Sequence, residues 1–467
     1  MIVDRVFTPG LAQVAYLIAD ESTGDVAVID PRRDVQVYLD WAAERNFRIS
    51  AILETHVHAD FVSGAVELHR VTGVPIFASA LGNQEFDYEP LRDGSRVPVG
   101  RLVLEARWTP GHTPEHVAFL LFDPDSSDAP QAMFSGDLIF AGEVGRPDLL
   151  GEAHTGQLAL QLFETLTQRI ADLPDELLVY PGHTAGSACG RKIGDAATTT
   201  LGEERAGTYA WQFTDAKAFV EGIMDEMPAP PPYYPRMKVV NRVGPALLAD
   251  LPEGTALSAE RVSSAIADGA LVIDARQEQS FDRAHIRGSF YAGSGSDFIA
   301  WVGWRAPYDR PIVLVLDDDA DVSAFVTELR RIGIDARVDF LAGGIDSWIA
   351  SGGSVDRLEV LTPAEFQSLM QSAEDATVLD VRSRDEWKTG HIENARNAFA
   401  GDISAGAPVD IDRESLVMLT CASGYRSRVA ASMLQSKGIS RIVQLDGGMD
   451  AWDGAGLPVA NAVGVGA

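Results

Sequence analysis

Six histidine and aspartate residues in the first half of the chain lie in the motifs THVHAD, PGHT, SGD and PGH. They are His56, His58, Asp60, His112, Asp137 and His183. Imidazole and carboxylate groups are ligands that first-row divalent metals bind. The first motif follows a strand predicted at residues 49–53, and alternation along an extended chain would place its three ligands on one side. Because the later motifs sit in loop contexts, the pattern predicts a metal site at one rim of a sheet.

A second kind of chemistry is indicated near the C-terminus, where a thiol lies between a strand and a helix. The strand predicted at residues 415–420 ends at Cys421, and the helix is expected over residues 427–437. Backbone N–H groups at a helix N-terminus stabilise an anion such as a thiolate. Gly424 lets the loop fold back without a Cβ atom, and Arg426 adds positive charge. The loop predicts a cysteine nucleophile, with a structural buried cysteine as the alternative.

A proline-rich segment separates the region with the metal motifs from the rest of the chain. Residues 227–235 read MPAPPPYYP, and proline removes the backbone donor that a helix or central strand needs. We therefore expect a first domain at residues 1–226 and a linker at residues 227–253. Pairs of apolar segments that could form hairpins predict a mixed sheet in this first domain.

The remainder of the chain repeats itself. Asp274, His285 and the Gly-Gly and Trp residues at 343–348 recur in the same order about 105 positions later. This spacing predicts two tandem globular domains, here called the first copy (residues 254–356) and the second copy (residues 357–467). Strands alternate with helices in each copy, which predicts an α/β domain with a parallel sheet.

The composition limits the classes of function. The 467 residues are 46% hydrophobic and 23% charged, which excludes a largely disordered chain. A formal net charge of −30 disfavours binding to nucleic acid or an anionic membrane. Two cysteines provide no disulfide framework. We expect a cytoplasmic protein without a signal peptide or a transmembrane helix.

The four metal-binding motifs, in this order, resemble the metallo-β-lactamase fold over about residues 1–225. That resemblance implies an αββα sandwich. Binuclear zinc hydrolases of this fold, such as the glyoxalase II group, carry HxHxDH, but here the last position is Phe61. A second metal would keep only Asp60, His183 and a share of Asp137. We therefore expect a mononuclear site.

Three further segments resemble the persulfide dioxygenases of this superfamily: residues 142–148, 186–192 and 202–205. The resemblance implies one Fe(II) per chain with three protein ligands, which are His56, His112 and Asp137. His58 would lie beside the metal or behind its ligands. Two imidazoles and one carboxylate leave coordination positions open, which non-heme iron oxygenases use for substrate and O₂.

Two residues in these segments are candidates for substrate binding. Arg146 would pair with a carboxylate of the thiol that carries the persulfide, or form a salt bridge to Asp148. Cys189 would be a small core residue, or a thiol in the pocket that accepts persulfide sulfur.

The loop that begins at Cys421, with the neighbouring DVR, GHI and GGM-W elements, resembles the active loop of a rhodanese. This resemblance implies that Cys421 carries sulfur, that Arg426 assists catalysis and that Gly424 helps to bind the sulfur. A cysteine phosphatase would place arginine six positions after its cysteine, but residue 427 is serine. The first copy has a run of aspartates here, with Asp317 in the place expected for the cysteine, so we predict that it is inactive.

Together these resemblances indicate a persulfide dioxygenase fused to an inactive and an active rhodanese domain. The expected reaction oxidises a low-molecular-weight thiol persulfide with O₂ to sulfite, and sulfite then accepts sulfur from Cys421 to give thiosulfate in sulfide detoxification. We expect a homo-oligomer without nucleic-acid or membrane partners. The alternatives are a zinc-dependent thioester hydrolase with an attached sulfur carrier, and a non-enzymatic persulfide sensor.

Overall fold

The computed structural model describes residues 1–225, 227–305, 308–373 and 375–460. The chain divides into two compact units, Met1–Asp250 with Arg330–Gly333, and Leu251–Leu329 with Ile334–Ala467. Within the described ranges, no helix combines the length and the apolar character needed to cross a membrane.

Two β-sheets form the centre of the first unit, and each has six strands among the described residues. The first sheet contains, in spatial order, β1 (Ile2–Thr8), β2 (Gln13–Asp20), β3 (Asp25–Ile29), β4 (Arg48–Leu53), β5 (Ile76–Ser79) and β6 (Glu89–Leu91). The second contains β14 (Thr199–Thr200), β13 (Leu178–Pro181), β10 (Ala132–Gly136), β9 (Val117–Phe122), β8 (Leu102–Trp108) and β7 (Arg96–Val99). A short hairpin, β11 (Ile139–Phe140) with β12 (Glu143–Val144), follows β10. Strands β2 and β3 pair antiparallel and β3 and β4 pair parallel, which confirms the predicted mixed sheet.

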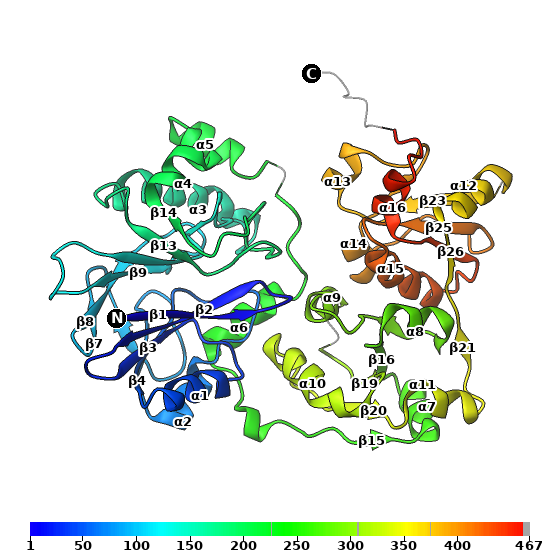
Figure 1. Ribbon diagram of the computed structural model, residues 1–467, viewed down its shortest axis with the longest axis horizontal. Helices are drawn as coiled ribbons and strands as arrows, with labels where there is room; N and C mark the ends of the chain where they lie inside the picture. The colour runs from blue at the N-terminus through cyan, green and yellow to red at the C-terminus, as the bar shows by residue number, and fades with distance from the viewer. Residues whose placement is uncertain (226, 306–307, 374, 461–467) are drawn as a thin grey trace. The chain divides into compact units, whose positions relative to one another are not determined.

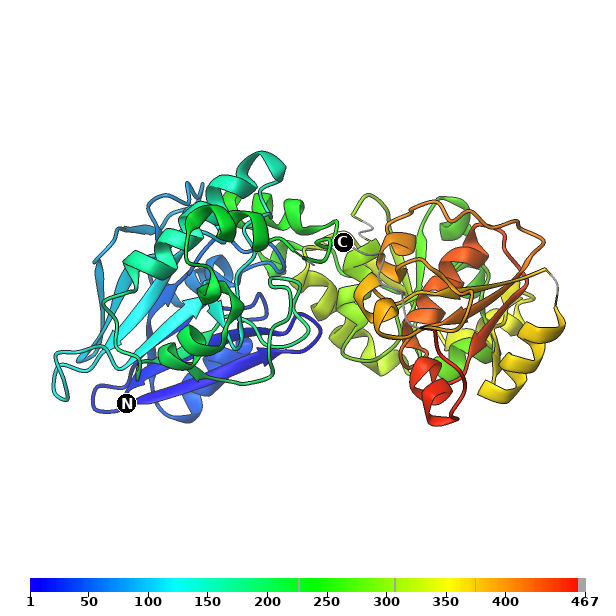
Figure 2. The ribbon, with the colours of Figure 1, turned by 90° about the horizontal axis from the view of Figure 1, so that it is seen from above.

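Helices cover the outer faces of both sheets, as Figure 1 shows and as Figure 2 shows from above. The helices of this unit are α1 (Gln36–Glu44), α2 (Ala65–Thr72), α3 (Glu152–Glu164), α4 (Leu201–Gly207), α5 (Ala216–Gly222) and α6 (Tyr234–Val243). Alternate side chains of β2 explain the layers. Val14 and Tyr16 pack between the two sheets, whereas Ala15 and Leu17 pack with residues of α1 and α2. Two apolar faces per strand require cover on both sides, and the predicted αββα sandwich is confirmed.

The proline-rich segment ends in a helix rather than in an extended linker. Helix α6 begins at Tyr234, with Pro235 in its first turn. Proline is tolerated there because the first N–H groups of a helix have no intrahelical partner. Residues up to Asp250 belong to the first compact unit, so most of the segment predicted to be a linker is part of the first domain's structure.

The two copies in the second unit have parallel sheets with the same order of strands, as predicted from the repeat. The first copy contains β15 (Ala256–Leu257), β20 (Val338–Leu341), β19 (Ile312–Val315), β16 (Leu271–Asp274) and β18 (Phe290–Tyr291). The second contains β22 (Glu359–Leu361), β26 (Ile442–Leu445), β25 (Leu416–Thr420), β23 (Ala376–Asp380) and β24 (Arg396–Asn397). In the first copy, β17 (His285–Ile286) and β21 (Val355–Asp356) form a separate antiparallel pair.

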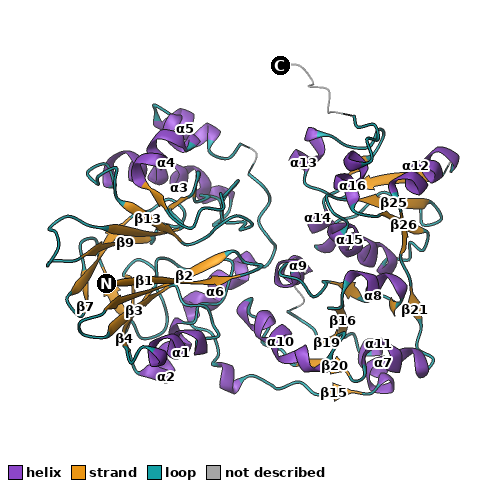
Figure 3. Cartoon of the chain, in the orientation of Figure 1, coloured by secondary structure: helices purple, strands orange, loops and turns teal. Residues whose placement is uncertain are grey.

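Helices lie on both faces of these sheets (Figure 3). The first copy has α7 (Ala259–Ala267), α8 (Glu278–Arg283), α9 (Phe298–Arg305), α10 (Val322–Arg331) and α11 (Gly344–Ala350). The second has α12 (Pro363–Ser372), α13 (Arg384–Thr389), α14 (Ala400–Ser404), α15 (Tyr425–Ser436) and α16 (Gly448–Gly454).

Several of the repeated motifs have the same structural role in both copies. Asp274 forms a buried salt bridge with Arg276, and Asp380 forms the corresponding one with Arg382, each at 2.7 Å. His285 stacks on Phe281 in the first copy and His391 stacks on Trp387 in the second, each with ring centroids 3.8 Å apart. These residues therefore stabilise the fold.

Candidate metal centre and sulfur-transfer loop

Three predicted ligands converge at one end of the sandwich. His56 follows β4, His112 lies in the loop between β8 and β9, and Asp137 follows β10. Their ligand atoms lie within 4.8 Å of one another. The Nε2 atom of His112 is 3.4 Å from Asp137 Oδ2, and that of His56 is 3.8 Å from the same oxygen. All three atoms are buried and form no hydrogen bond in the described part of the chain, so this donor set fits a bound metal ion.

The second polar atom of each of these three side chains, the one not directed at the group, has a hydrogen-bond partner. His56 Nδ1 lies 2.9 Å from Thr55 Oγ1, and His112 Nδ1 lies 2.9 Å from the carbonyl oxygen of Arg146. Asp137 Oδ1 lies 2.8 Å from His183 Nδ1. Such partners fix the orientation of metal ligands and direct the remaining atom toward the metal.

The electrostatic environment keeps the ligands in the protonation states that metal binding requires. Burial lowers the pKa of His112 to about 4 and lowers the pKa of His56 well below its usual value. Burial alone would raise the pKa of Asp137, but His183 and His112 hold it well below its usual value. Neutral imidazoles and a charged carboxylate are therefore present at neutral pH.

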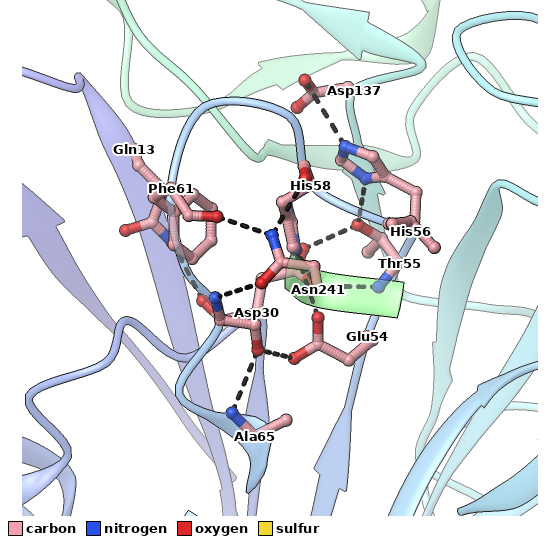
Figure 4. Close-up of polar contacts among 12 residues, drawn as sticks. Gln13, Asp30, Glu54, Thr55, His56, His58, Phe61, Ala65, Asp137 and Asn241 are labelled. Atoms are coloured by element: carbon pink, nitrogen blue, oxygen red, sulfur yellow. Dashed lines mark hydrogen bonds and ion pairs between the residues drawn. The ribbon is translucent and has the colours of Figure 1, made fainter. Parts of the chain in front are cut away.

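The expectation that His56, His58 and Asp60 lie on one side is wrong, because residues 54–60 form no strand. Figure 4 shows His56 directed toward Asp137, whereas His58 turns toward Asp30 and Glu54. His58 Nε2 lies 3.2 Å from an Asp30 oxygen and 3.4 Å from a Glu54 oxygen. Burial opposes a charge on His58, but these two carboxylates hold its pKa well above the usual value. His58 is thus directed away from the group formed by His56, His112 and Asp137.

Asp60 and His183 form a separate buried group with Cys189. The Nε2 atom of His183 lies 2.8 Å from Asp60 Oδ2, so the imidazole connects Asp60 to Asp137. Burial raises the pKa of the Cys189 thiol well above its usual value, and Asp60 and Asp137 raise it further. Phe61, which replaces the additional histidine donor, is 1% exposed and packs on His58.

Sequence reasoning missed residues that position the metal loop. Asn241 Nδ2 donates hydrogen bonds to the carbonyl oxygens of His58 and Phe61, at 2.9 and 2.7 Å (Figure 4). Tyr233 Oη donates to the carbonyl oxygen of Asp60 at 2.7 Å. Both residues lie in the segment predicted to be a linker, and proline-rich composition gives no signal for this role.

His116 and Lys238 are two further residues near the ligands. His116 Nε2 accepts the backbone N–H of Asp137 at 3.1 Å, which fixes the start of that loop. Its place four residues after His112 was the available signal. Lys238, on α6, is partly buried, and its positive charge contributes to the lowered pKa of both His56 and His112.

Arg146 forms the salt bridge that was one of its two expected roles. Its guanidinium, 1% exposed, bonds both oxygens of Asp148 at 2.7 and 2.8 Å. It also donates to the carbonyl oxygens of Ala188 and Pro228. These bonds tie the loop after Asp137 to the segment around Cys189. A contact with substrate stays a prediction.

In the second copy, Cys421 lies directly after β25, as predicted, and is 1% exposed. Its Sγ atom accepts the backbone N–H of Gly424 at 3.1 Å. Gly424 has φ of +105°, a conformation that side-chain-bearing residues rarely adopt. A Cβ atom at Gly448 would lie 2.4 Å from the carbonyl oxygen of Cys421, which explains why this position beside the loop needs glycine.

Arg426 is held within its own domain. Its Nη1 and Nη2 atoms bond the two carboxylate oxygens of Glu386, on α13, at 2.7 and 2.6 Å. Burial disfavours the Glu386 carboxylate, but the bonds from Arg426 lower its pKa to about 2. A bidentate pair of this kind fixes the orientation of the guanidinium.

In the first copy, strand register corrects the predicted counterpart of Cys421. Asp274 pairs with Val315, just as Asp380 pairs with Thr420, so the residue that follows is Leu316 rather than Asp317. Asp317 instead accepts the backbone N–H of Gln277 at 2.7 Å, and Asp319 accepts that of Gly343 at 3.0 Å. A leucine supplies no nucleophile, which is in keeping with the predicted inactivity.

Comparison with protein families agrees with this architecture. Residues 8–183 match the metallo-beta-lactamase superfamily, and residues 258–351 and 362–455 each match the rhodanese-like domain. The chain belongs to the metallo-β-lactamase superfamily and carries two rhodanese-like domains after that fold.

Two of the relatives carry the names of different activities. The mitochondrial persulfide dioxygenase ETHE1 of Bos taurus is 30% identical over 190 residues, which are 39% of this chain and 68% of that protein. The hydroxyacylglutathione hydrolase of Polaromonas sp. is 34% identical over 187 residues, covering 39% of this chain and 66% of the relative. A crystal structure of a metallo-beta-lactamase from Staphylococcus aureus subsp. aureus COL aligns with 73% of this chain and 99% of its own, with 31% identity and a TM-score of 0.65.

Proposed function

We propose that the chain is a persulfide dioxygenase with an attached sulfurtransferase. The first domain oxidises a low-molecular-weight thiol persulfide, and Cys421 of the second copy carries sulfane sulfur. In the first reaction, R–S–SH, O₂ and H₂O give R–SH, sulfite and two protons, and four electrons pass from sulfur to O₂. In the second, sulfite takes the outer sulfur of a Cys421 persulfide, so that one S–S bond breaks, another forms and thiosulfate leaves.

The observation that carries this proposal is a difference in hydrogen bonding between two candidate metal positions. One is formed by His56, His112 and Asp137, and the other would use Asp60, His183 and a share of Asp137. The ligand atoms of His56, His112 and Asp137 have no other hydrogen-bond partner among the described residues. By contrast, Asp60 and His183 bond each other at 2.8 Å, and Phe61 replaces a nitrogen donor. This arrangement supports one Fe(II) per chain held by two imidazoles and one carboxylate.

Held by His56, His112 and Asp137, an Fe(II) ion would supply open coordination positions for a persulfide sulfur and O₂. The chain's own residues would bind and orient the substrate. Lys238 is the candidate for attracting the persulfide anion, because its charge acts on the metal ligands. Cys189, beside Asp60 and His183, would stay protonated and neutral because burial raises its pKa.

A zinc-dependent thioester hydrolase remains the second candidate, because a hydroxyacylglutathione hydrolase is 34% identical to this chain over 187 residues. The two candidates differ in metal content and in the need for O₂. Protein purified without oxygen should contain about one iron per chain and consume O₂ when glutathione persulfide or coenzyme A persulfide is added. Two zinc ions per chain, with hydrolysis of S-lactoylglutathione and no O₂ uptake, would refute the dioxygenase and support the hydrolase.

A further inference from the structure

The first copy contributes acidic side chains to the helix that begins at the sulfur-transfer loop. Arg428, in the first turn of α15, is 4% exposed. Its Nε and Nη2 atoms donate to the Asp282 carboxylate at 2.9 and 2.8 Å. Its Nη1 atom lies 2.5 Å from Glu278 Oε2. Both acids are on α8 of the first copy, and both copies belong to the same compact unit.

The same guanidinium contacts the backbone of the loop. Arg428 Nη1 donates to the carbonyl oxygen of Gly424 at 3.1 Å, and the N–H of Gly424 donates to Cys421 Sγ, also at 3.1 Å. Glycine has more backbone freedom than any other residue. A bond to the Gly424 carbonyl therefore restrains the residue whose N–H must point at the sulfur.

Two further hydrogen bonds join α15 to the end of β18 in the first copy and to the residue that follows it. Tyr425 Oη donates to the carbonyl oxygen of Ala292 in the first copy. Ser432 Oγ, one turn beyond Arg428, accepts the backbone N–H of Tyr291 at 3.1 Å. The first copy thus meets the start of α15 through backbone groups as well as through charge.

The two acidic residues on α8 have no acidic counterparts in the second copy. The positions 106 residues later, on α13 of the second copy, hold Arg384 in place of Glu278 and Lys388 in place of Asp282. The two copies therefore carry opposite charges at these positions. A buried guanidinium is costly unless it is paired, and only the first copy supplies carboxylates to Arg428 in the described structure.

We propose that the first copy is a positioning element for the sulfur-transfer loop, and that Asp282 and Glu278 act through Arg428 and Gly424 on the Cys421 sulfur. The inference rests on the proposed role of Cys421 as the nucleophile. Asp282 and Glu278 do not touch substrate. They hold the loop in the conformation in which an N–H group stabilises the thiolate before sulfur transfer.

The full-length protein allows a direct test with Asp282→Asn. This variant keeps Glu278 as one partner of Arg428. Two rates would be measured at pH 7: alkylation of Cys421 by iodoacetamide, followed by mass spectrometry of the Cys421 peptide, and thiosulfate:cyanide sulfurtransfer. The variant removes the negative charge and one of the two acceptor oxygens of Asp282. This loss should slow alkylation and lower kcat by about tenfold, with little change in KM for thiosulfate.

Asp282→Glu keeps the carboxylate and should recover most of both rates, while Asp268→Asn removes an exposed charge elsewhere in the first copy and should behave as wild type. If Asp282→Asn does not fold, Glu278→Gln, at a half-exposed position, should show the same effects at smaller amplitude. Wild-type alkylation and kcat in a folded Asp282→Asn or Glu278→Gln protein would overturn the inference. The alkylation rate tests the positioning role even if the wild type forms no thiocyanate. An absence of thiocyanate would instead refute the proposed sulfur transfer.

Discussion

Replacement of His112 by alanine tests whether the three converging residues hold the metal. The imidazole is completely buried, and it supplies one of three ligand atoms that lie within 4.8 Å of one another. Loss of a residue that only hydrogen-bonds to a metal ligand weakens metal binding by about 10–100-fold. Loss of a ligand itself should weaken binding at least as much, which corresponds to about 1.4–2.7 kcal/mol. The carbonyl of Arg146 also loses its 2.9 Å hydrogen bond, which costs about 1–3 kcal/mol of stability. This cost should lower the melting temperature of the first unit only.

The assay combines metal analysis, O₂ uptake with glutathione persulfide, and thiosulfate:cyanide sulfurtransfer on the same preparation. His112→Ala should lose iron and O₂ uptake but keep sulfurtransfer, because Cys421 belongs to the other compact unit. His154→Ala is the matched control, since this histidine is exposed on α3. Full iron content in His112→Ala would refute the ligand assignment. Loss of both activities in a folded protein would refute the division of the two reactions between domains.

Further outcomes are expected at other positions. Phe61→His should restore a nitrogen donor at the second metal position and raise bound metal from about one to about two ions per chain by elemental analysis; an unchanged content would contradict the role given to Phe61. Lys238→Met should raise KM for glutathione persulfide more than it lowers kcat, and the reverse pattern would place the lysine in another role. Cys421→Ser should keep O₂ uptake but release sulfite in place of thiosulfate, because a hydroxyl does not accept sulfane sulfur at neutral pH; thiosulfate at the wild-type rate would exclude Cys421 from this step. Glu386→Gln tests stability. The pKa of Glu386 is lowered from 4.5 to about 2, so its stabilising effect is fully present above about pH 4.5 and is lost as pH falls through 2. The melting-temperature difference from wild type should therefore shrink over that range, and a constant difference would contradict the ion-pair account.

Much of the architecture follows from local patterns in the sequence. Pairs of apolar segments predicted the mixed sheet of the first domain, the order of the metal motifs resembled that of the αββα fold, and the repeat of Asp, His and Gly-Gly motifs predicted two domains of one topology. A metal site at one rim of the fold was also predictable, because each candidate ligand follows a strand end or a glycine turn, whereas the choice of His56, His112 and Asp137 came from the family resemblance.

The partners of buried polar groups were decided only by the tertiary structure. The spacing of the first motif predicted His58 on the same side as His56, but it turns to Asp30 and Glu54 because the loop is not an extended strand. Asn241 holds that loop from about 180 residues away in the chain. Asp282 pairs with Arg428 across two domains. Hydrogen bonds and ion pairs between distant segments leave no periodic signal, because each depends on the packing of whole elements rather than on the spacing of neighbouring residues.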